Sequence, residues 1–326
     1  KYLFAANMRA DGSSKFPEDK RWGVFPSFSG GWRISSEPFF AGLQNTINDM
    51  KIRASWGQLG NDKITNYQYY STLTTVGSPT LDGDIFTAYA QNGMANTNIK
   101  WEVTTQTDLG IDLKFLNNRV NMSIDYFDKE TSDILVQVPL VSSLGVGTAP
   151  FRNAGKVSNK GFDLDISYRN MEGEFKYEIG ANVSHVKNEL KTLGIVGRTE
   201  MFSANYKNYN VGRIAEGEPI GHFYVLNDLG LFQSQAEIDN YKSAKTGQKI
   251  QPYAQPGDIK FEDRNGDGVI GADDRFNAGN SFPKLTYSLN FNASYKGFDF
   301  SMHWVGSEGN KIFNGLTFGE KLMVGT

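Results

Sequence analysis

Hydrophobic and polar residues alternate with a period of two along most of this chain. Between residues 101 and 115, for example, Leu109, Ile111 and Leu113 alternate with Asp108 and Asp112. This spacing places successive side chains on opposite faces of a β-strand. The same alternation occurs at 2–10, 22–34, 50–56, 120–126, 162–168, 175–184, 285–295 and 298–304. The pattern therefore predicts about nine strands and an all-β fold.

The connections between these runs differ in length in a regular way. Short connections, at 117–118, 171–173 and 296–297, are fit for tight hairpins. Long ones span 61–99, 128–156 and 187–282, and segment 36–49 has room for one helical turn on the short side. Short turns on one side and long loops on the other are typical of a transmembrane β-barrel.

We therefore expect residues 1–326 to form one partial barrel domain, an antiparallel transmembrane β-barrel segment that contributes about nine strands to a larger barrel. The stretch 187–282 is predicted to be a long extracellular loop insertion. Because the sequence starts directly in a strand-like run at Lys1 and ends in a glycine-rich segment, we interpret it as an internal piece of a longer protein.

The two faces of the predicted strands differ in chemistry. The polar face carries mostly Ser, Thr, Asn, Gly and Asp, which suits the wall of a water-filled lumen. The charged residues predicted to line this lumen are Arg33, Arg53, Asp108, Asp112, Asp125, Asp163 and Asp165. Aromatic residues at strand ends, Trp22, Trp101, Phe115, Tyr168 and Tyr295, fit the aromatic girdles of a membrane interface. The alternative from pattern alone is a soluble, glycine-rich β-sandwich or β-helix.

Composition excludes several other classes of protein. Only 39% of the residues are hydrophobic and no window is long and apolar enough for a spanning helix. The chain has no cysteine, so a disulfide scaffold and a thiolate zinc site are excluded. The formal net charge of -3 argues against nucleic-acid binding. The 35 glycines and 23 phenylalanines are unusual for a soluble domain and agree with a barrel wall.

Residues 263–274 match the spacing of an EF-hand-type calcium loop. Oxygen ligands stand at the first, third and fifth positions, a glycine at the sixth and a carboxylate at the twelfth. The predicted ligands are the side chains of Asp263, Asn265, Asp267 and Asp274 and the carbonyl of Val269. We expect calcium here, in the role of stiffening the loop. The alternative is a polar hairpin turn, because Asn-Gly and Asp-Gly are common turn dipeptides.

No catalytic pattern stands out. The three histidines are far apart in the sequence, and no nucleophile elbow, phosphate loop or paired-histidine motif is present. We therefore expect no enzyme. Aromatic residues in the long loops are better candidates for contact with a substrate or a partner, or for packing of the loops themselves. They are Tyr67, Tyr69, Tyr70, Phe86 and Tyr89 in the first long loop, and Tyr206 and Tyr209 in the third.

Several motifs, spread in order along the chain, resemble those of a known family. They are RADGSSKF at 9–16, RWGVFPSFSGGWRIS at 21–35, KIRASWGQLGN at 51–61, GKVSNKGFD at 155–163, GEPIGHFY at 217–224, PGDIKFEDRNGDG at 256–268 and YKGFDF at 295–300. The set resembles the barrel of SusC/RagA-type TonB-dependent outer-membrane transporters.

The resemblance implies a bacterial outer-membrane location and a 22-stranded barrel with a plugged lumen. It also implies import of glycan oligomers or peptides, together with a SusD-like surface lipoprotein and the TonB complex. Contact with TonB would come through parts absent from this sequence, as would the plug. Outer-membrane lipid is a further expected partner. The alternatives are a passive porin or surface adhesin barrel, and a soluble calcium-stiffened β-domain.

Overall fold

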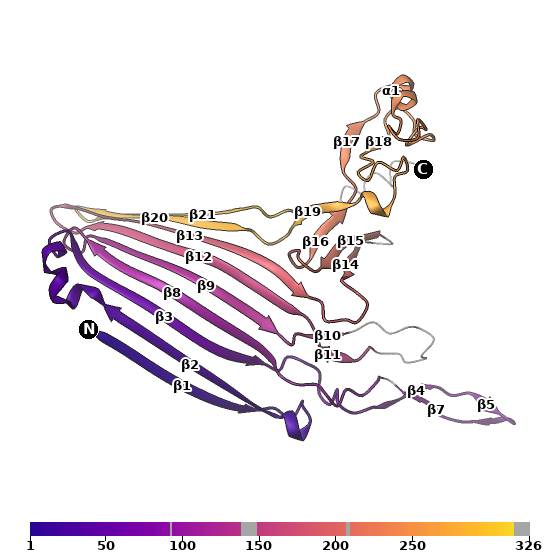
Figure 1. Cartoon of the computed structure of the whole chain (residues 1–326), viewed down its shortest axis with the longest axis horizontal. Coiled ribbons are helices and arrows are strands. Elements are labelled where there is room, and N and C mark those ends of the chain that lie inside the picture. The colour runs from indigo at the N-terminus through magenta and orange to yellow at the C-terminus, as the bar shows by residue number, and fades with distance from the viewer. Residues whose placement is uncertain (92, 138–148, 207–208, 316–326) are drawn as a thin grey trace. The chain divides into compact units, whose positions relative to one another are not determined.

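The computed structural model describes residues 1–91, 93–137, 149–206 and 209–315. Nine long strands form one antiparallel sheet in the order β1-β2-β3-β8-β9-β12-β13-β20-β21 (Figure 1). Their bounds are Tyr2–Gly12 (β1), Trp22–Arg33 (β2), Ile47–Asn61 (β3), Glu102–Phe115 (β8), Val120–Ser132 (β9), Lys156–Asn170 (β12), Phe175–Thr192 (β13), Leu285–Tyr295 (β20) and Phe298–Glu308 (β21). The predicted all-β, antiparallel architecture is confirmed, with the sheet open at β1 and β21 within the described residues.

The strands extend further toward the long connections than the hydrophobic runs suggested. Strand β9 continues to Ser132 and β13 to Thr192, so the connections begin later than the expected 128 and 187. Charged residues such as Asp128 and Lys187 interrupt the apolar alternation in these extensions. The ladder continues because backbone hydrogen bonds between strands do not depend on apolar side chains.

The short connections gather at one end of the sheet. Asn117, Asn118 and Lys296 adopt positive φ angles of 57°, 64° and 47°, as tight hairpin turns between twisted strands require. The connection from β2 to β3 contains 3-10 helices at Ile34–Ser36 and Pro38–Leu43, where one helical turn was expected.

The long connections contain paired strands that period-two reasoning did not predict. In the first of the two compact units of the chain they are β4 (Leu73–Gly77) with β7 (Ala88–Gln91), β5 (Thr80–Leu81) with β6 (Asp84–Ile85), and β10 (Leu135–Gln137) with β11 (Phe151–Asn153). In the second they are β14 (Glu200–Tyr206), β15 (Tyr209–Ala215), β16 (His222–Val225) and β19 (Phe276–Asn280) in one sheet, and β17 (Asp228–Leu231) with β18 (Ile259–Phe261). Helix α1 (Gln235–Asn240) and 3-10 helices at Glu18–Lys20 and Ala272–Asp274 complete the fold.

The chain divides into two compact units. The first comprises Lys1–Thr199, Glu216–Glu218 and Lys284–Glu308, and contains the nine-stranded sheet. The second comprises Glu200–Ala215, Pro219–Pro283 and Gly309–Thr326, and contains most of the predicted insertion.

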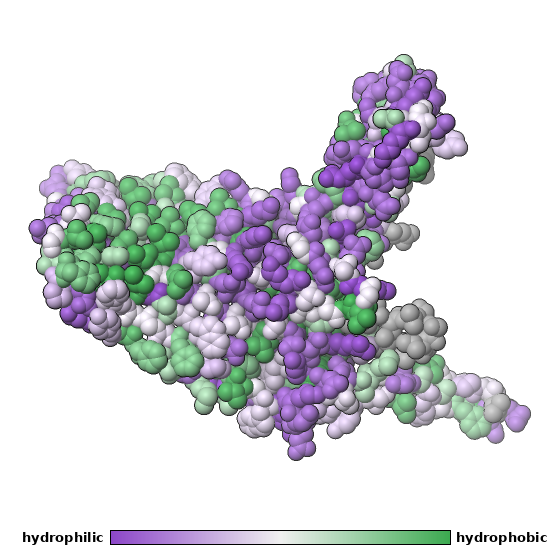
Figure 2. Space-filling model, in the orientation of Figure 1, coloured by the Kyte–Doolittle hydropathy of each residue, from purple (hydrophilic) through white to green (hydrophobic). Residues whose placement is uncertain are grey.

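The apolar face of the nine-stranded sheet is not covered by any described residue of its unit. Phe4, Leu109 and Phe298 are 79%, 53% and 80% exposed, respectively. In Figure 2, hydrophobic residues gather over the end of the sheet near the short turns, and hydrophilic residues over the other end. A sandwich in water would bury such a face against a second layer, whereas a barrel wall leaves it to lipid. Within the described residues, no helix has the length and hydrophobicity needed to cross a bilayer.

A small hydrophobic core lies at the end of the sheet from which the long connections leave. Phe16, Ile64 and Ile99 are buried there, and Trp101 packs against them. The Trp101 ring lies 5.2 Å from that of Phe16, and its Nε1 donates to the carbonyl of Arg21. Trp101 therefore belongs to this loop core and not to the interfacial girdle in which we expected it.

Candidate functional site on the polar face of the sheet

The strand register places the seven predicted lumen residues on one face. Arg53 lies opposite Gly110, Gly110 opposite Asp125, and Asp125 opposite Asp163. Directly paired residues of an antiparallel sheet share a face, and residues two apart on one strand share it as well. By the same parity Arg33, Asp108, Asp112 and Asp165 also belong to it.

Three of these residues meet in a charged cluster around Arg53. Its Nε and Nη2 donate to the two oxygens of Asp112, each at 2.8 Å, and Nη2 also donates to Asp125 at 3.0 Å. Ser123 Oγ completes the cluster, because it lies 3.0 Å from Asp112 Oδ1 and 3.1 Å from Asp125 Oδ2 and its single proton can be donated to either carboxylate. Such forked, charge-assisted hydrogen bonds fix the guanidinium plane.

Gly110 provides the space that this cluster needs. A Cβ atom at position 110 would lie 2.2 Å from Asp125 Oδ1 and 2.8 Å from Arg53 Cζ. Such distances are far shorter than van der Waals contact, so any side chain here would displace the guanidinium. The glycine in the middle of a strand is thus explained by close approach of neighbouring side chains.

The remaining predicted lumen residues lie around the cluster without joining it. Arg33 forms a forked pair with Asp49, with both nitrogen–oxygen distances at 2.8 Å, nearer the short turns. Asp108 accepts from Ser55 at 3.0 Å. Asp163 and Asp165 form no ion pair with any described residue.

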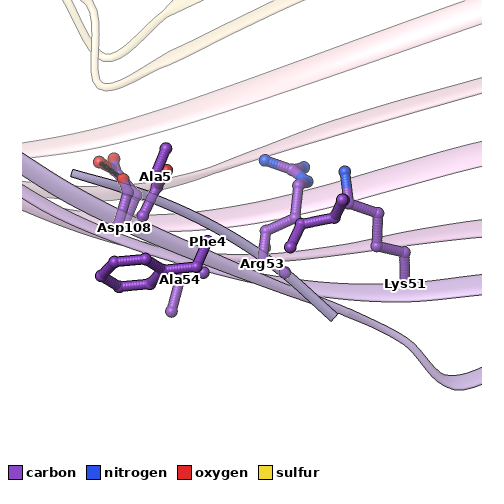
Figure 3. A pocket seen from close by; sticks show the side chains of 12 residues that line it. Phe4, Ala5, Lys51, Arg53, Ala54 and Asp108 are labelled. Carbon is purple, nitrogen blue, oxygen red and sulfur yellow. Dashed lines mark hydrogen bonds between the residues drawn. The ribbon is translucent and has the colours of Figure 1, made fainter. Parts of the chain in front are cut away.

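A hollow of about 430 Å³ lies beside the cluster. Figure 3 shows Lys51, Arg53 and Asp108 pointing to one side of the sheet, whereas Phe4 and Ala54 point to the other. Lys51 Nζ lies 3.8 Å from Asp112, so a second cation borders the hollow. The arrangement presents fixed positive and negative groups side by side along the hollow, which suits polar contacts.

Sequence reasoning did not single out Lys51, Ser55, Gly110 and Ser123. Parity alone could have found the first two, because Lys51 and Ser55 lie two residues from Arg53 on the same strand. The roles of Gly110 and Ser123 depend on the register between β3, β8 and β9, which the sequence does not state.

The predicted loop aromatics separate into three groups. Tyr67, Tyr69 and Tyr70 form a cluster, with ring centroids 4.3 Å apart for Tyr69 and Tyr70. Phe86 and Tyr89 lie outside this cluster and are 50% and 65% exposed. The structure therefore brings the three tyrosines together, and among the described residues their rings contact neither Phe86 nor Tyr89.

Tyr206 and Tyr209 belong to the second unit. They lie opposite each other in the β14–β15 pair. The Tyr206 hydroxyl donates to the carbonyl of Gly315 at 2.7 Å, and its ring lies 5.4 Å from that of Phe313. Tyr206 therefore packs within its own unit, while Tyr209 is 57% exposed.

The calcium-type loop is ordered by hydrogen bonds from its own backbone. Asp263 Oδ2 accepts from Gly268 N, and Asp267 Oδ1 accepts from Val269 N at 2.8 Å. The Val269 N–H and the Asn265 amide lower the pKa of Asp267. Asp274 is fully buried and accepts from three backbone amides, including that of Gly271 at 2.7 Å. These bonds hold the loop in a bent conformation.

The donor set of this loop fits a hard cation in one respect and is incomplete in another. Asp263 Oδ1 is buried without a hydrogen-bond partner among the described residues, so one carboxylate oxygen is available. Those residues contain, however, no group of three or more acidic or histidine side chains gathered as metal ligands. The set therefore depends on Asn265 and the Val269 carbonyl, and calcium binding stays a prediction.

Comparison with known proteins identifies the family to which this sheet belongs. Residues 1–321 match the family described as TonB dependent receptor-like, beta-barrel. The chain belongs to this family. It is 30% identical over 315 residues to the TonB-dependent receptor P26 of Formosa agariphila, covering 96% of this chain and 31% of that relative. It is 27% identical over 317 residues to the TonB-dependent receptor SusC of Bacteroides thetaiotaomicron, covering 96% and 30%.

Solved structures agree with this TonB-dependent receptor barrel fold. The RagAB peptide transporter matches with a TM-score of 0.76 at 21% identity, over 94% of this chain and 32% of that one. The RagAB peptide importer in its closed-closed state matches with a TM-score of 0.75 at 22% identity, over 95% and 32%. The present chain thus spans about a third of these proteins. It is part of the wall of a bacterial outer-membrane β-barrel.

Proposed function

We propose that the complete protein imports nutrient oligomers, glycans or peptides, across the outer membrane in a TonB-dependent manner. The observation that carries the proposal is the match to the receptor barrel family over residues 1–321, together with relatives named SusC and RagAB. Because the relatives are named as receptors and transporters, the proposal is transport without an enzymatic step.

In this proposal the polar face of the sheet is the lumen wall. Arg53, Asp112 and Asp125 would form a fixed hydrophilic surface there, because each charge is held by a neighbour of opposite sign. Such a surface lets water and polar substrate groups exchange hydrogen bonds without a large net field.

The long connections would face the cell exterior and meet the substrate or a lid. The tyrosine cluster of Tyr67, Tyr69 and Tyr70 offers aromatic rings that are close together and tilted to one another, which suit sugar faces and peptide side chains alike. We propose a SusD-like surface lipoprotein as the lid and the TonB complex as the energy source, both engaged by the complete protein.

We also propose that the loop 263–274 holds calcium. Asp263, Asn265, Asp267 and Asp274 would supply side-chain oxygens and Val269 a carbonyl. The ion would add stiffness to the second unit and would take no part in a reaction.

Uptake by the complete protein tests the transport proposal. A labelled oligomer would be offered to bacteria that carry the gene, with the TonB complex intact or deleted. We expect uptake only when both the gene and the TonB complex are present. Uptake that depends on the gene but not on TonB would instead support a passive porin. Co-purification of a surface lipoprotein with the complete protein tests the lid separately.

A further inference from the structure

The apolar face of the nine-stranded sheet changes from apolar to charged residues abruptly near the long connections. Tyr126, Phe162 and His185 form one cross-strand row on this face, and the Phe162 and His185 rings stack with centroids 5.6 Å apart. Two residues further along the same strands, a charged row begins with Lys160 and Lys187. Two residues span about 7 Å of strand, so the charges directly border the apolar band.

Lys160 and Lys187 lie directly opposite each other in the β12–β13 ladder. Like charges at directly paired positions destabilise a sheet unless something compensates them. Asp128 compensates Lys160, with its Oδ2 at 2.7 Å from Nζ. The charge of Lys187 is compensated less well, because the distance from its Nζ to Oε2 of Glu189 is 3.5 Å.

Glu189 is shared between two cations. Its other oxygen lies 2.5 Å from Nζ of Lys191, so its charge is largely committed there. The Lys187 side chain is 72% exposed. Together with the Lys156–Glu130 pair, these contacts join four lysines to three carboxylates. The lysines are Lys156, Lys160, Lys187 and Lys191, and the excess positive charge is concentrated at the Lys160–Lys187 position.

We propose that the Lys160–Lys187 pair binds the phosphate of an anionic lipid headgroup. Both ammonium groups can extend from the edge of the apolar band toward a headgroup while their methylene stems stay against it. A phosphate between the two ammonium groups offsets their mutual repulsion. The acyl chains of the lipid then lie on the row of Tyr126, Phe162 and His185. The inference rests on the outer-membrane location of the barrel and is independent of what the protein transports.

Lipid retention by the complete protein tests this proposal. The protein would be reconstituted in vesicles of phosphatidylcholine and phosphatidylglycerol in equal amounts, then extracted gently, and the retained phosphatidylglycerol counted by native mass spectrometry. Lys160→Gln/Lys187→Gln should retain this lipid roughly fivefold to thirtyfold less well, given the usual contribution of one lysine at an anionic surface. Lys160→Arg/Lys187→Arg should retain it as the wild type does.

The matched control is Lys129→Gln/Lys176→Gln, which removes the same charge from the opposite face of the sheet. Equal loss in this variant, or unchanged retention in the Lys160→Gln/Lys187→Gln variant, would overturn the proposal. Inorganic phosphate, tested in phosphatidylcholine vesicles, separates the two sources of the anion. The midpoint of thermal unfolding is then compared with inorganic phosphate and with the lipid. If phosphate raises this midpoint as much as the lipid does, and only when Lys160 and Lys187 are present, the site belongs to free phosphate instead. Heat-modifiable migration in gels verifies that every variant is folded.

Discussion

Arg53 on β3 binds Asp112 on the neighbouring strand β8 through two hydrogen bonds of 2.8 Å. The contact is diagonal, because the residue directly opposite Arg53 in the ladder is Gly110. Asp112 in turn lies opposite Lys51. The diagonal reach is possible because Gly110 leaves open the space that a side chain would fill. One guanidinium therefore links β3 to both β8 and β9 on the polar face.

Replacing Arg53 tests how much this link contributes. Arg53→Met removes the fork and leaves Asp112 and Asp125 facing each other across Gly110. We expect unfolding of the complete barrel in detergent to become easier by about 1–2 kcal/mol, a value kept low because the side chains are partly exposed. Arg53→Lys should fall between, since an ammonium cannot form the fork. Unfolding at the wild-type midpoint in both variants would contradict the role of Arg53.

Gly110→Ala should disrupt the same cluster by occupying the space beneath the guanidinium of Arg53. The added Cβ would meet the guanidinium and Asp125, and we expect a loss of about 1–3 kcal/mol in unfolding free energy. Gly30→Ala is the matched control, because a Cβ at Gly30 meets nothing within 4 Å. Similar midpoints for the two variants in denaturant titrations would show that space at position 110 is not limiting.

An arginine scan of neighbouring positions tests the assignment of faces. Val183 lies on the apolar face opposite Leu164, whereas Asn182 lies on the polar face opposite Asp165. Val183→Arg should destabilise the folded barrel in a bilayer by about 2–4 kcal/mol, as a charge facing lipid does. Asn182→Arg should be mild, because it faces water and an acidic neighbour. Equal costs at the two positions, measured by unfolding from vesicles, would reject the faces.

Proteolysis tests the calcium loop. With calcium present, Asp263→Ala/Asp267→Ala should be cut faster than the wild type between 240 and 282, because two ligands are missing. Asp273→Ala is the control, since Asp273 lies in the same loop but outside the ligand spacing. If a chelator leaves digestion of the wild type unchanged, the loop is held by its hydrogen bonds alone.

The second unit should loosen locally in acid. The Gln233 backbone N–H, followed by Lys260, lowers the pKa of Glu237 below its ordinary value of 4.5. A carboxyl with a lowered pKa stabilises the folded state fully above about pH 4.5, and this contribution is lost as the pH falls through the lowered pKa. The protection of the amides of segment 228–262, measured by hydrogen exchange relative to their intrinsic rate at each pH, should therefore fall below pH 4.5, and less so in Glu237→Gln. Identical pH profiles for the two proteins would exclude Glu237 as the cause.

The nine strands could be predicted from sequence because alternation is a local property. Leu109, Ile111 and Leu113 share a face whatever their partners are, so strand existence and parity follow from spacing alone. The same parity placed all seven charged lumen residues on one face. It could not place Trp101, because its packing on Phe16 joins segments far apart in the chain.

The short strands of the long connections were missed for a related reason. Strands such as β10 and β11 have only three residues each, too few to establish a period. They form because their backbones hydrogen-bond to a second short strand of the same connection. That pairing depends on where the longer strands position the connection.

The sequence by itself determined that this chain is an alternating β-protein with one apolar and one polar side, because side-chain direction in a strand depends only on position. The tertiary structure alone decided which residues became partners. The Arg53 cluster, the space at Gly110 and the opposed Lys160 and Lys187 all follow from register between strands. Register is set by backbone hydrogen bonds between distant segments, and a shift of two residues would preserve every hydrophobic face while replacing every one of these contacts.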